Sequence, residues 1–400
     1  MRKKAESDLN NNFDVLIAGA GFAGGVCARS LAEKGRRVLV AERRSHIGGN
    51  AYDCTDSAGV LIHQYGPHIF HTNNKQVFEF LSRFTQWRRY QHKVIANLPR
   101  DNPEVVPAHK TTDGRFFFPV PFNLDSLKNA FGAKEGERLG KKLLDAYPAQ
   151  SQVTILELRQ NPDPEIAAIA DYVYEHVFVH YTMKQWGQTP EEIDPNTTAR
   201  VPVRLSDDGR YFQDAYQGMP LHGYTALFEA MLDHPNIEVR LNTDARPLMK
   251  DFTGDVIYTG PVDELFDFKF GPLPYRTLDF QFETKQVDQF QAAGTVNYTV
   301  DEDFTRITEF KILTGQERPG VTTIMKEYSR AYTGAENEIP YYAIINPENN
   351  ALYSKYQAEA AKMPQLHLLG RLAEYKYYNM DAIAARSLEL AAQLTEVQYE

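Results

Sequence analysis

Three glycines and one carboxylate in this chain have the spacing of a dinucleotide-binding site. Gly19, Gly21 and Gly24 follow the G-x-G-x-x-G pattern, and Glu42 follows about 20 residues later. In such a site the first glycine permits a tight turn and the second lets the backbone approach a pyrophosphate. The third glycine lets a helix pack closely on a strand, and the acid accepts hydrogen bonds from ribose hydroxyls. The pattern therefore predicts that the chain binds a dinucleotide cofactor.

The residues around the glycines predict a strand, a helix and a second strand. Residues 14–18 read DVLIA, which is typical of a buried parallel strand. Residues 26–35 read VCARSLAEKG, with small and apolar residues at helical intervals, and VLVAE follows at 38–42. The N-terminus of this helix would present free N–H groups and a partial positive charge to the phosphates. A complete βαβ unit makes the dinucleotide site a firm prediction.

The residues after Glu42 favour FAD over NAD as the cofactor. The segment RRSHI separates Glu42 from Gly48, Gly49 and Asn50. An acid followed after five residues by a glycine pair resembles the FAD-binding oxidases of the amine-oxidase type. In those proteins the pair lets the chain pass close to the cofactor.

The C-terminal part of the chain is predicted to return to the cofactor. Residues 366–370 (LHLLG) read as a buried strand, and Met380 and Asp381 open a helix rich in Ala and Leu. The N-terminus of that helix would stabilise negative charge at the pyrimidine end of a reduced flavin. The alternative is an ordinary terminal helix that packs on the sheet. Residues 237–260 read as further strands of the same, discontinuous domain.

The insertions between these segments have different characters. Residues 124–200 show helical periodicity, whereas residues 263–345 alternate like antiparallel strands. Residues 98–114 read as a long surface connection. Residues 187–210 carry Arg200, Arg204 and Arg210 and have the length and composition of a lid. The alternative for this segment is a solvated connector whose arginines have no function.

The predicted fold class is α/β, with a discontinuous Rossmann-like FAD-binding domain, an inserted helical domain and an antiparallel β-sheet domain. The expected divisions are residues 1–84, 213–262 and 360–400 for the FAD-binding domain, 124–200 for the helical substrate or lid domain, 85–123 and 263–359 for the sheet domain, and 201–212 for a mobile loop and connection.

Composition narrows the class of protein. The net charge of −10 argues against nucleic acid as a partner, because duplex binding needs basic stripes. No apolar run approaches the roughly 18–20 residues needed to span a bilayer, and the charged start has no apolar segment of a secretory signal. Two cysteines, Cys27 and Cys54, in a chain of 400 residues suggest neither a disulfide framework nor a metal site. We therefore expect a cytoplasmic protein without metal or membrane association.

Beyond the glycine pattern, a series of motifs runs nearly from end to end of the chain and resembles bacterial UDP-galactopyranose mutases. YGPHIFHT and the arginine-bearing motifs are specific to that family. The motifs are GGN at 48–50, YGPHIFHT at 65–72, FPVPFNL at 118–124, YTMKQWG at 181–187, RVPVR at 200–204, YF at 211–212, YQGMPLHGYT at 216–225, GPVDELF at 260–266, YRTLDF at 275–280, TRITE at 305–309, KEYSRA at 326–331, IPYY at 339–342 and GRLAEYKYYNMD at 370–381.

The resemblance implies an isomerase that interconverts UDP-galactopyranose and UDP-galactofuranose by ring contraction. In that family FAD is active in its reduced form, and its N5 is the nucleophile at the anomeric carbon, so the cofactor carries the chemistry. The protein positions the sugar, holds the diphosphate and excludes water. The resemblance also implies a homodimer and an external reductant such as NAD(P)H.

The resemblance assigns roles to individual residues. Arg200 and Arg306 would clamp the diphosphate, since each guanidinium presents paired donors. His68 and His71 would lie beside the isoalloxazine, and Tyr181 would stack on uracil. The remaining substrate-binding candidates are Thr182, Trp186, Tyr211, Phe212, Tyr342, Tyr377, Asn379, His92 and Phe178. The cofactor-binding candidates are Gly19, Gly21, Phe22, Ala23, Gly24, Glu42, Arg43, Gly49, Asn50, His68, Ile69, Arg371, Tyr378 and Met380.

Several points stay open at the level of sequence. Many relatives have Asn at the position of His92 and Asp at that of Asn379, which puts local hydrogen bonding near the substrate in doubt. Tyr341 is the alternative to Tyr342. From pattern alone, Tyr181 could be a core residue and the histidines could be buried structural ones. The rival functions are an FAD-dependent amine oxidase or desaturase-type oxidoreductase, and a binding protein on the same fold that has lost flavin.

Overall fold

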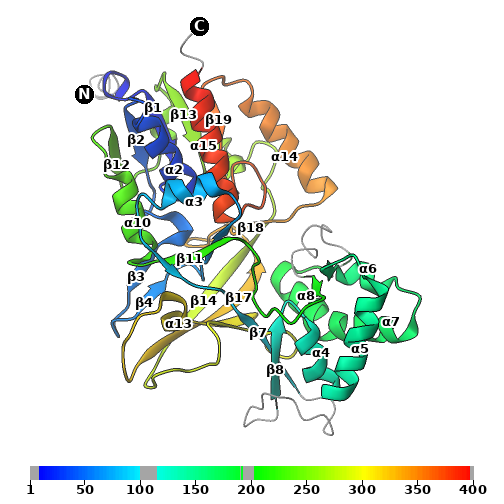
Figure 1. Cartoon of the computed structure of the whole chain (residues 1–400). Helices are drawn as coiled ribbons and strands as arrows, with labels where there is room; N and C mark the ends of the chain where they lie inside the picture. Colours follow the sequence, from blue (N-terminus) through cyan, green and yellow to red (C-terminus); the bar gives the residue numbers. More distant parts are fainter. Residues whose placement is uncertain (1–8, 100–114, 190, 192–201, 397–400) are drawn as a thin grey trace. The chain divides into compact units, whose positions relative to one another are not determined.

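The computed structural model describes residues 9–99, 115–189, 191 and 202–396, and its chain divides into two compact units. The first unit comprises residues 1–90, 214–276 and 332–400, and the second comprises 91–213 and 277–331. Figure 1 shows the elements of each unit along the chain. Each unit is described by itself below.

A five-stranded parallel sheet is the centre of the first unit. Its order is β12-β2-β1-β13-β19, so strands from three distant parts of the chain lie side by side. The predictions of strands at 14–18, 38–42, 237–260 and 366–370 are thereby confirmed, and the structure places all of them in one sheet. The strands are β1 (Val15–Ala18), β2 (Val38–Ala41), β12 (Ile237–Arg240), β13 (Asp255–Tyr258) and β19 (Leu366–Leu368).

Both faces of this sheet are buried, as a parallel sheet with helices on each side requires. Val15 and Ile17 of β1 point into one apolar cluster, and Leu16 points into another on the opposite face. The first cluster is covered by three packed helices, namely α2 (Phe22–Ala32), α10 (Gly223–Leu232) and α15 (Met380–Glu396). Because alternate side chains are buried on both faces, the strands read as continuous apolar runs in the sequence.

The remaining elements of the first unit connect these layers. A small sheet has the order β5-β11-β6, and β3 pairs with β4. These elements are η1 (Gly49–Ala51), β3 (Asp53–Thr55), β4 (Leu61–His63), β5 (Phe70–Thr72), α3 (Lys75–Leu81), β6 (Trp87–Arg89), β11 (Tyr216–Pro220), α11 (Arg246–Met249), α12 (Val262–Leu265), β18 (Tyr342–Ala343) and α14 (Pro347–Ala360).

A second sheet has the order β18-β14-β17-β16-β15-β7-β8. Its strand β14 (Tyr275–Lys285) starts in the first unit, where β18 pairs with it, and continues into the second. The pairs β14–β18, β15–β16, β16–β17 and β7–β8 are antiparallel, whereas β7 and β15 are parallel. A long stretch of chain separates these two strands, so no tight hairpin constrains their direction. The other strands are β7 (Val94–Pro99), β8 (Arg115–Val120), β15 (Thr295–Tyr298), β16 (Arg306–Glu309) and β17 (Thr322–Ala331).

Helices fill the rest of the second unit and share one apolar core with strands β7 and β8. Polar caps define several of their starts: the side chains of Asn123, Thr154 and Asp163 each accept a backbone N–H of the first turn. The elements are α4 (Leu124–Phe131), α5 (Ala133–Ala146), β9 (Gln152–Val153), α6 (Ile155–Arg159), α7 (Pro164–Val173), η2 (Tyr174–Val179), α8 (His180–Trp186), β10 (Val203–Arg204) and α13 (Phe310–Thr314).

The expected α/β class, with a Rossmann-like part, a helical part and a sheet part, is confirmed. The proposed boundaries of three domains stay a prediction. The two compact units divide the chain differently. Residues 332–359 belong to the unit of the parallel sheet, and the predicted helical domain shares the other unit with most of the predicted sheet domain. The connection predicted at 98–114 lies, from residue 100 onward, outside the described residues.

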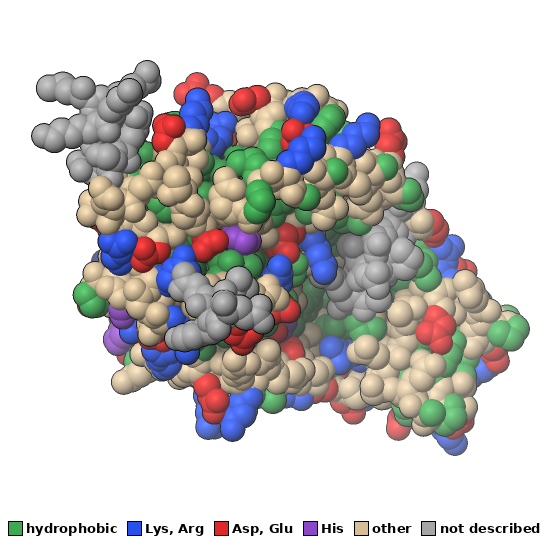
Figure 2. Space-filling model, turned by 90° about the horizontal axis from the view of Figure 1, so that it is seen from above, with side chains coloured by type: hydrophobic (Ala, Val, Ile, Leu, Met, Phe, Trp, Pro, Cys, Tyr) green, Lys and Arg blue, Asp and Glu red, His purple; other side chains and the backbone are tan. Residues whose placement is uncertain are grey.

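Charged side chains of both signs are interspersed on the face drawn in Figure 2. No helix among the described residues is both long and apolar enough to cross a bilayer. Cys27 is buried and Cys54 half-buried, and both are free thiols in the described structure. The cytoplasmic location stays a prediction.

We expect Gly24→Ala to destabilise the chain by about 3 kcal/mol, the upper end of overpacking costs. A Cβ at Gly24 would lie 1.9 Å from the carbonyl oxygen of Gly19, which belongs to the backbone and cannot move aside. Thermal unfolding of the purified variant measures the loss. The matched control is Gly25→Ala, whose Cβ would meet the movable Met231 Cε at 2.9 Å. Equal losses for the two variants would contradict this account.

Candidate functional site

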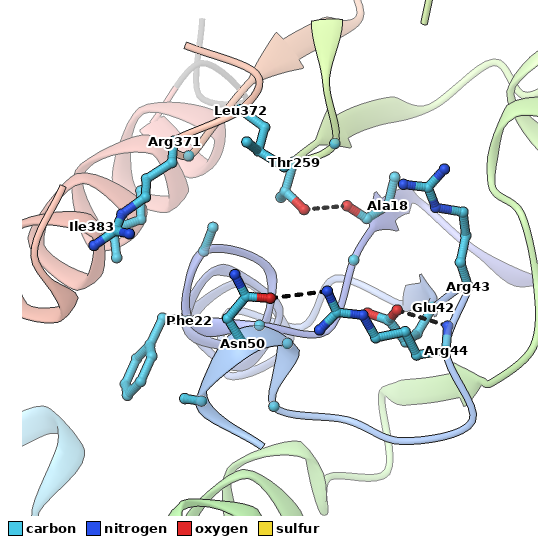
Figure 3. A pocket seen from close by; sticks show the side chains of 18 of the residues that line it. Ala18, Phe22, Glu42, Arg43, Arg44, Asn50, Thr259, Arg371, Leu372 and Ile383 are labelled. Atoms are coloured by element: carbon cyan, nitrogen blue, oxygen red, sulfur yellow. Dashed lines mark hydrogen bonds between the residues drawn. The ribbon is translucent and has the colours of Figure 1, made fainter. Parts of the chain in front are cut away.

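A tight turn between β1 and α2 opens the site. Gly19 has a φ of +109°, and a Cβ there would lie 2.2 Å from the hydroxyl oxygen of Thr259. That hydroxyl donates to the carbonyl of Ala18 at 2.6 Å, so β13 holds the end of β1 (Figure 3). Only glycine fits this position, because its backbone is left-handed and its side-chain space is occupied.

A pocket lies at the carboxyl ends of the parallel strands, in the first unit. Ligands of open α/β sheets bind at this edge, where loops diverge. Residues from the N-terminal βαβ unit, from β13 and from the loop after β19 all contribute to its wall (Figure 3). The lining includes Gly19, Gly21, Phe22, Ala23, Glu42, Arg43, Arg44, Gly49, Asn50, His68, Thr259, Gly260, Gly370, Arg371, Leu372, Tyr378, Met380 and Ile383.

Glu42, at the end of β2, connects two walls of this pocket. Its side chain is buried, and one carboxylate oxygen accepts the N–H of Ala20 in the glycine turn at 2.8 Å. The other oxygen accepts the N–H of Arg44 at 2.9 Å. Each carboxylate oxygen has a second lone-pair direction, which is available to a ribose hydroxyl. Glu42 therefore holds the glycine turn at Ala20 and the start of the loop at Arg44 in place, and it also faces the pocket.

Two consecutive arginines follow Glu42, and they have different environments. The Arg43 guanidinium is half exposed and pairs with Glu264 at 2.8 Å. The Arg44 guanidinium lies over the ring of Tyr65. It also donates to Asn50 Oδ1 at 2.9 Å (Figure 3). Its Nη1 is buried and has no hydrogen-bond partner among the described residues. A buried cationic donor without a partner fits an anionic or oxygen-rich ligand in the pocket.

The loop between β19 and α15 forms the opposite wall. Gly370 has a φ of +106°, and its N–H donates to Glu374 at 2.8 Å. Arg371 Nε donates to the carbonyl of Tyr378 at 2.7 Å, which closes the loop on itself. Helix α15 begins at Met380, and Met380 and Ile383 both line the pocket. The predicted approach of this helix N-terminus to the cofactor pocket is consistent with that placement.

Two histidines come from the region of β4 and β5: His63 lies on β4, and His68 lies between the two strands. His63 is fully buried, and its Nδ1 accepts the N–H of His68 at 3.0 Å. Burial lowers the pKa of His63 to about 4, so the ring is neutral at pH 7. His68 itself lines the pocket. The sequence argument selected His68 but missed His63, because burial of a histidine has no local sequence signal.

His71 lies on β5, opposite Gln217 of β11. Its Nδ1 lies 2.8 Å from an oxygen of Asp214, whose other oxygen accepts from Asn73 at 2.8 Å. A carboxylate at Nδ1 fixes the ring orientation and the tautomer of a histidine. On the same strand, Thr72 donates to Asp381 in the first turn of α15 at 2.8 Å.

An aromatic and cationic cluster lies beside the pocket in the first unit. The rings of Tyr342 and Tyr377 stack with centroids 5.8 Å apart, and Arg371 lies over both rings. Tyr341 is buried, whereas Tyr342 is half-buried. Exposure therefore favours Tyr342 over Tyr341 as the substrate-facing residue. Asn379 directly precedes α15.

A second group of predicted substrate residues belongs to the second unit. The His92 ring lies 5.7 Å from that of Tyr211 and 6.0 Å from that of Phe212, and the Tyr211 N–H donates to the carbonyl of His92. Arg306, at the start of β16, faces Glu327 of β17 in the strand register. Its Nε and Nη2 donate to one oxygen of the fully buried Glu327 at 2.9 and 2.7 Å.

Phe178, Tyr181, Thr182 and Trp186 lie on one long helix that contains a π-helical turn, η2. The buried positions of α7 continue regularly to Val177, and an unbroken α-helix would next bury Tyr181. Phe178 and Thr182 are buried instead, because the π turn absorbs one extra residue. Tyr181 is left half-buried.

Most of the residues predicted from the sequence to bind the cofactor line this pocket, and their role in cofactor binding stays a prediction. Gly24 and Ile69 do not line it: Gly24 packs on the Gly19 carbonyl, and Ile69 packs on the apolar core. Arg200 lies outside the described residues. Thr259 and Gly260 were missed although they follow a predicted strand, and Arg44 was missed because spacing alone does not separate it from Arg43. The described residues hold no cluster suited to a metal ion.

The comparisons with known proteins extend over nearly the whole chain. The family model for UDP-galactopyranose mutase matches residues 176–377, and one for NAD(P)-binding Rossmann-like domains matches 17–84. A probable UDP-galactopyranose mutase of Klebsiella pneumoniae is 38% identical over 383 residues, which cover 95% of this chain and 94% of that one. The chain belongs to the UDP-galactopyranose mutase family.

Other relatives show the range of this family and its fold. A dTDP-fucopyranose mutase of Escherichia coli is 33% identical to this chain, with coverage of 94% of this chain and 97% of that one. A crystal structure of reduced UDP-galactopyranose mutase has a TM-score of 0.66 at 15% identity, and covers 97% of this chain and 95% of that chain. Relatives of this chain are therefore named for different nucleotide sugars.

We expect the buried His63 to make stability pH-dependent. Because its folded pKa lies below the ordinary 6.5, its contribution is complete above that pH and is lost as pH falls toward about 4. Between pH 6.5 and 5 the loss is about 2 kcal/mol, from 1.36 kcal/mol per pH unit. In His63→Asn, whose amide oxygen can still accept from His68, the thermal midpoint should fall less between pH 7 and 5 than in the wild type. Equal falls would contradict this role of His63.

Proposed function

We propose that this chain interconverts UDP-galactopyranose and UDP-galactofuranose, with FAD bound in the pocket and active in its reduced form. The observation that carries the proposal is the nearly full-length match to the mutase family, combined with an intact dinucleotide pocket. The match over both halves of the chain favours the mutase over the oxidoreductase, which needs only the dinucleotide-binding part. The intact Gly19 turn and Glu42 argue against a binding protein that has lost flavin.

The pocket residues fit FAD. The turn at Gly19 and Gly21 and the N-terminus of α2 suit a pyrophosphate, and Glu42 suits the ribose hydroxyls. The unpartnered Arg44 Nη1 suits a further oxygen of the cofactor. When bound and reduced, FAD supplies the nucleophile, its N5, for the anomeric carbon of the sugar. The N-terminus of α15 would stabilise negative charge on the reduced flavin.

The protein's own groups would bind and orient the nucleotide sugar. Arg306 suits the diphosphate because Glu327 holds its guanidinium in one orientation. Arg200 would supply the second cation. Tyr181, half-buried on its helix, suits the uracil ring, and Tyr342 and Tyr377 suit the sugar. Asp214 would orient His71, and with His68 that ring would exclude water from the reacting face.

The UDP-sugar is our choice of substrate because the matching family model and the Klebsiella relative both have UDP-galactopyranose mutase in their names. The relative named for dTDP-fucopyranose makes that sugar nucleotide the competitor to test. A homodimer and an external reductant such as NAD(P)H remain parts of the proposal that rest on the family alone.

The test is an assay of the flavin-loaded protein with UDP-galactofuranose, with and without dithionite. We expect a yellow protein that forms UDP-galactopyranose only after reduction, because only reduced flavin has a nucleophilic N5. Chromatography of the nucleotide sugars measures the product, and dTDP-fucofuranose is assayed in parallel. No conversion by reduced protein would refute the mutase, and faster conversion of the dTDP-sugar would refute our choice of substrate.

We expect Arg306→Ala to lower kcat/KM by about one to two decades, since a charge-assisted hydrogen bond contributes roughly 1.5–3 kcal/mol. Arg306→Lys keeps a charge beside Glu327 but loses the paired donors, and should lose about one decade. The control is Arg330→Ala on β17, whose side chain pairs with the exposed Asp279. Steady-state rates of the three variants measure the effect, and an unchanged rate in Arg306→Ala would exclude it from the diphosphate site.

A further inference from the structure

A nucleoside diphosphate has two recognisable ends, and in the second unit they would be bound by groups on different elements. Tyr181 lies on the helix α8, and Arg306 lies at the start of strand β16. A ligand that spans both groups gains affinity only if their separation is held constant. Contacts that connect α8 with the segment leading into Arg306 would hold this separation constant.

The side chain of Lys184 on α8 makes this connection. Its Nζ donates to the carbonyl oxygens of Tyr298 at 2.5 Å, Glu302 at 2.9 Å and Phe304 at 3.3 Å. Phe304 lies two residues before Arg306. An ammonium group has three N–H donors, and three carbonyls of one loop fit that number. Lys184 thus fastens the loop 298–304 to the helix that carries Tyr181.

Two further hydrogen bonds fasten the same helix to the same region. The buried hydroxyl of Thr299 donates to the carbonyl of His176 in the π turn at 2.5 Å. The hydroxyl of Ser329 donates to the carbonyl of Gln185 at 2.6 Å.

Strand β17 links the last of these contacts to Arg306. Glu327 and Ser329 are two residues apart on β17, so their side chains lie on one face of the strand. Glu327 holds the Arg306 guanidinium, and Ser329 holds the end of α8. The helix is therefore connected to Arg306 both through the loop 298–304 and through β17.

We propose that Lys184 is a positioning residue that sets the separation between the base-stacking face of α8 and the phosphate-binding Arg306. This inference rests on the proposed function, because it takes the ligand to be a nucleoside diphosphate. Lys184 does not touch the ligand in this account. It acts through the loop 298–304, so its loss weakens a ligand that spans both ends more than a ligand that occupies one end.

The experiment compares UDP with uridine, titrated separately into the flavin-loaded full chain and followed by ligand-observed NMR. The dissociation constant of uridine divided by that of UDP measures how much the diphosphate adds to base binding. In Lys184→Met, which keeps most of the apolar stem but lacks the ammonium, we expect this ratio to fall at least tenfold. Lys184→Arg should recover part of it, and Lys285→Met, at a lysine on β14 paired with Glu283, should leave it unchanged.

A fall in thermal midpoint with the ratio preserved within about twofold would show that Lys184 is merely structural and would overturn the proposal. Equal weakening of uridine and UDP would also overturn it, since Lys184 would then support the base site alone. Should Lys184→Met fail to fold, Ser329→Ala removes the parallel contact, and an unchanged ratio there would overturn the proposal. If the wild-type chain binds neither ligand, the proposed function itself fails.

Discussion

Burial of both faces of the parallel sheet is the constraint on which the rest of the first unit depends. Val15 and Ile17 pack on one side and Leu16 on the other, so these side chains of β1 are buried in the core and cannot contact a ligand. Functional groups can emerge only where the strands end and the chain turns away. Glu42, Thr259 and Gly370 all stand at or just beyond such ends, and the pocket is the space that their loops leave between them.

Much of this arrangement could be predicted because it follows local rules. The glycine turn, the acid at the end of β2 and the helix after Asn379 each have a signature in a short stretch of sequence. The environments of the side chains do not. Both arginines line the pocket, but nothing local separates Arg43, which is half exposed and pairs with Glu264, from Arg44, whose Nη1 is buried. His63 likewise differs from His68 only through long-range burial, which depends on packing between distant segments.

In the second unit, regular periodicity was the misleading signal. A helical pattern predicts that Tyr181 belongs to the buried stripe, yet a single π turn shifts the stripe so that Thr182 replaces it. The direction of β7 against β15 is a similar case, because alternation identifies strands but not how they run. Family resemblance selects Tyr181 as a substrate residue whatever the period implies, and that role stays a prediction.

The three-segment construction of the pocket also bears on how the protein is made. Helix α15 packs on α2 in the core, and it follows the other segments of the pocket in the chain, so the ribosome makes it after them. Until α15 emerges, α10 covers α2 without it, and the pocket lacks the wall formed by Arg371 and Met380. Part of the apolar surface of α2 is therefore uncovered while the earlier segments are made, and exposed apolar surface promotes aggregation. The complete pocket forms only after all three segments have been made.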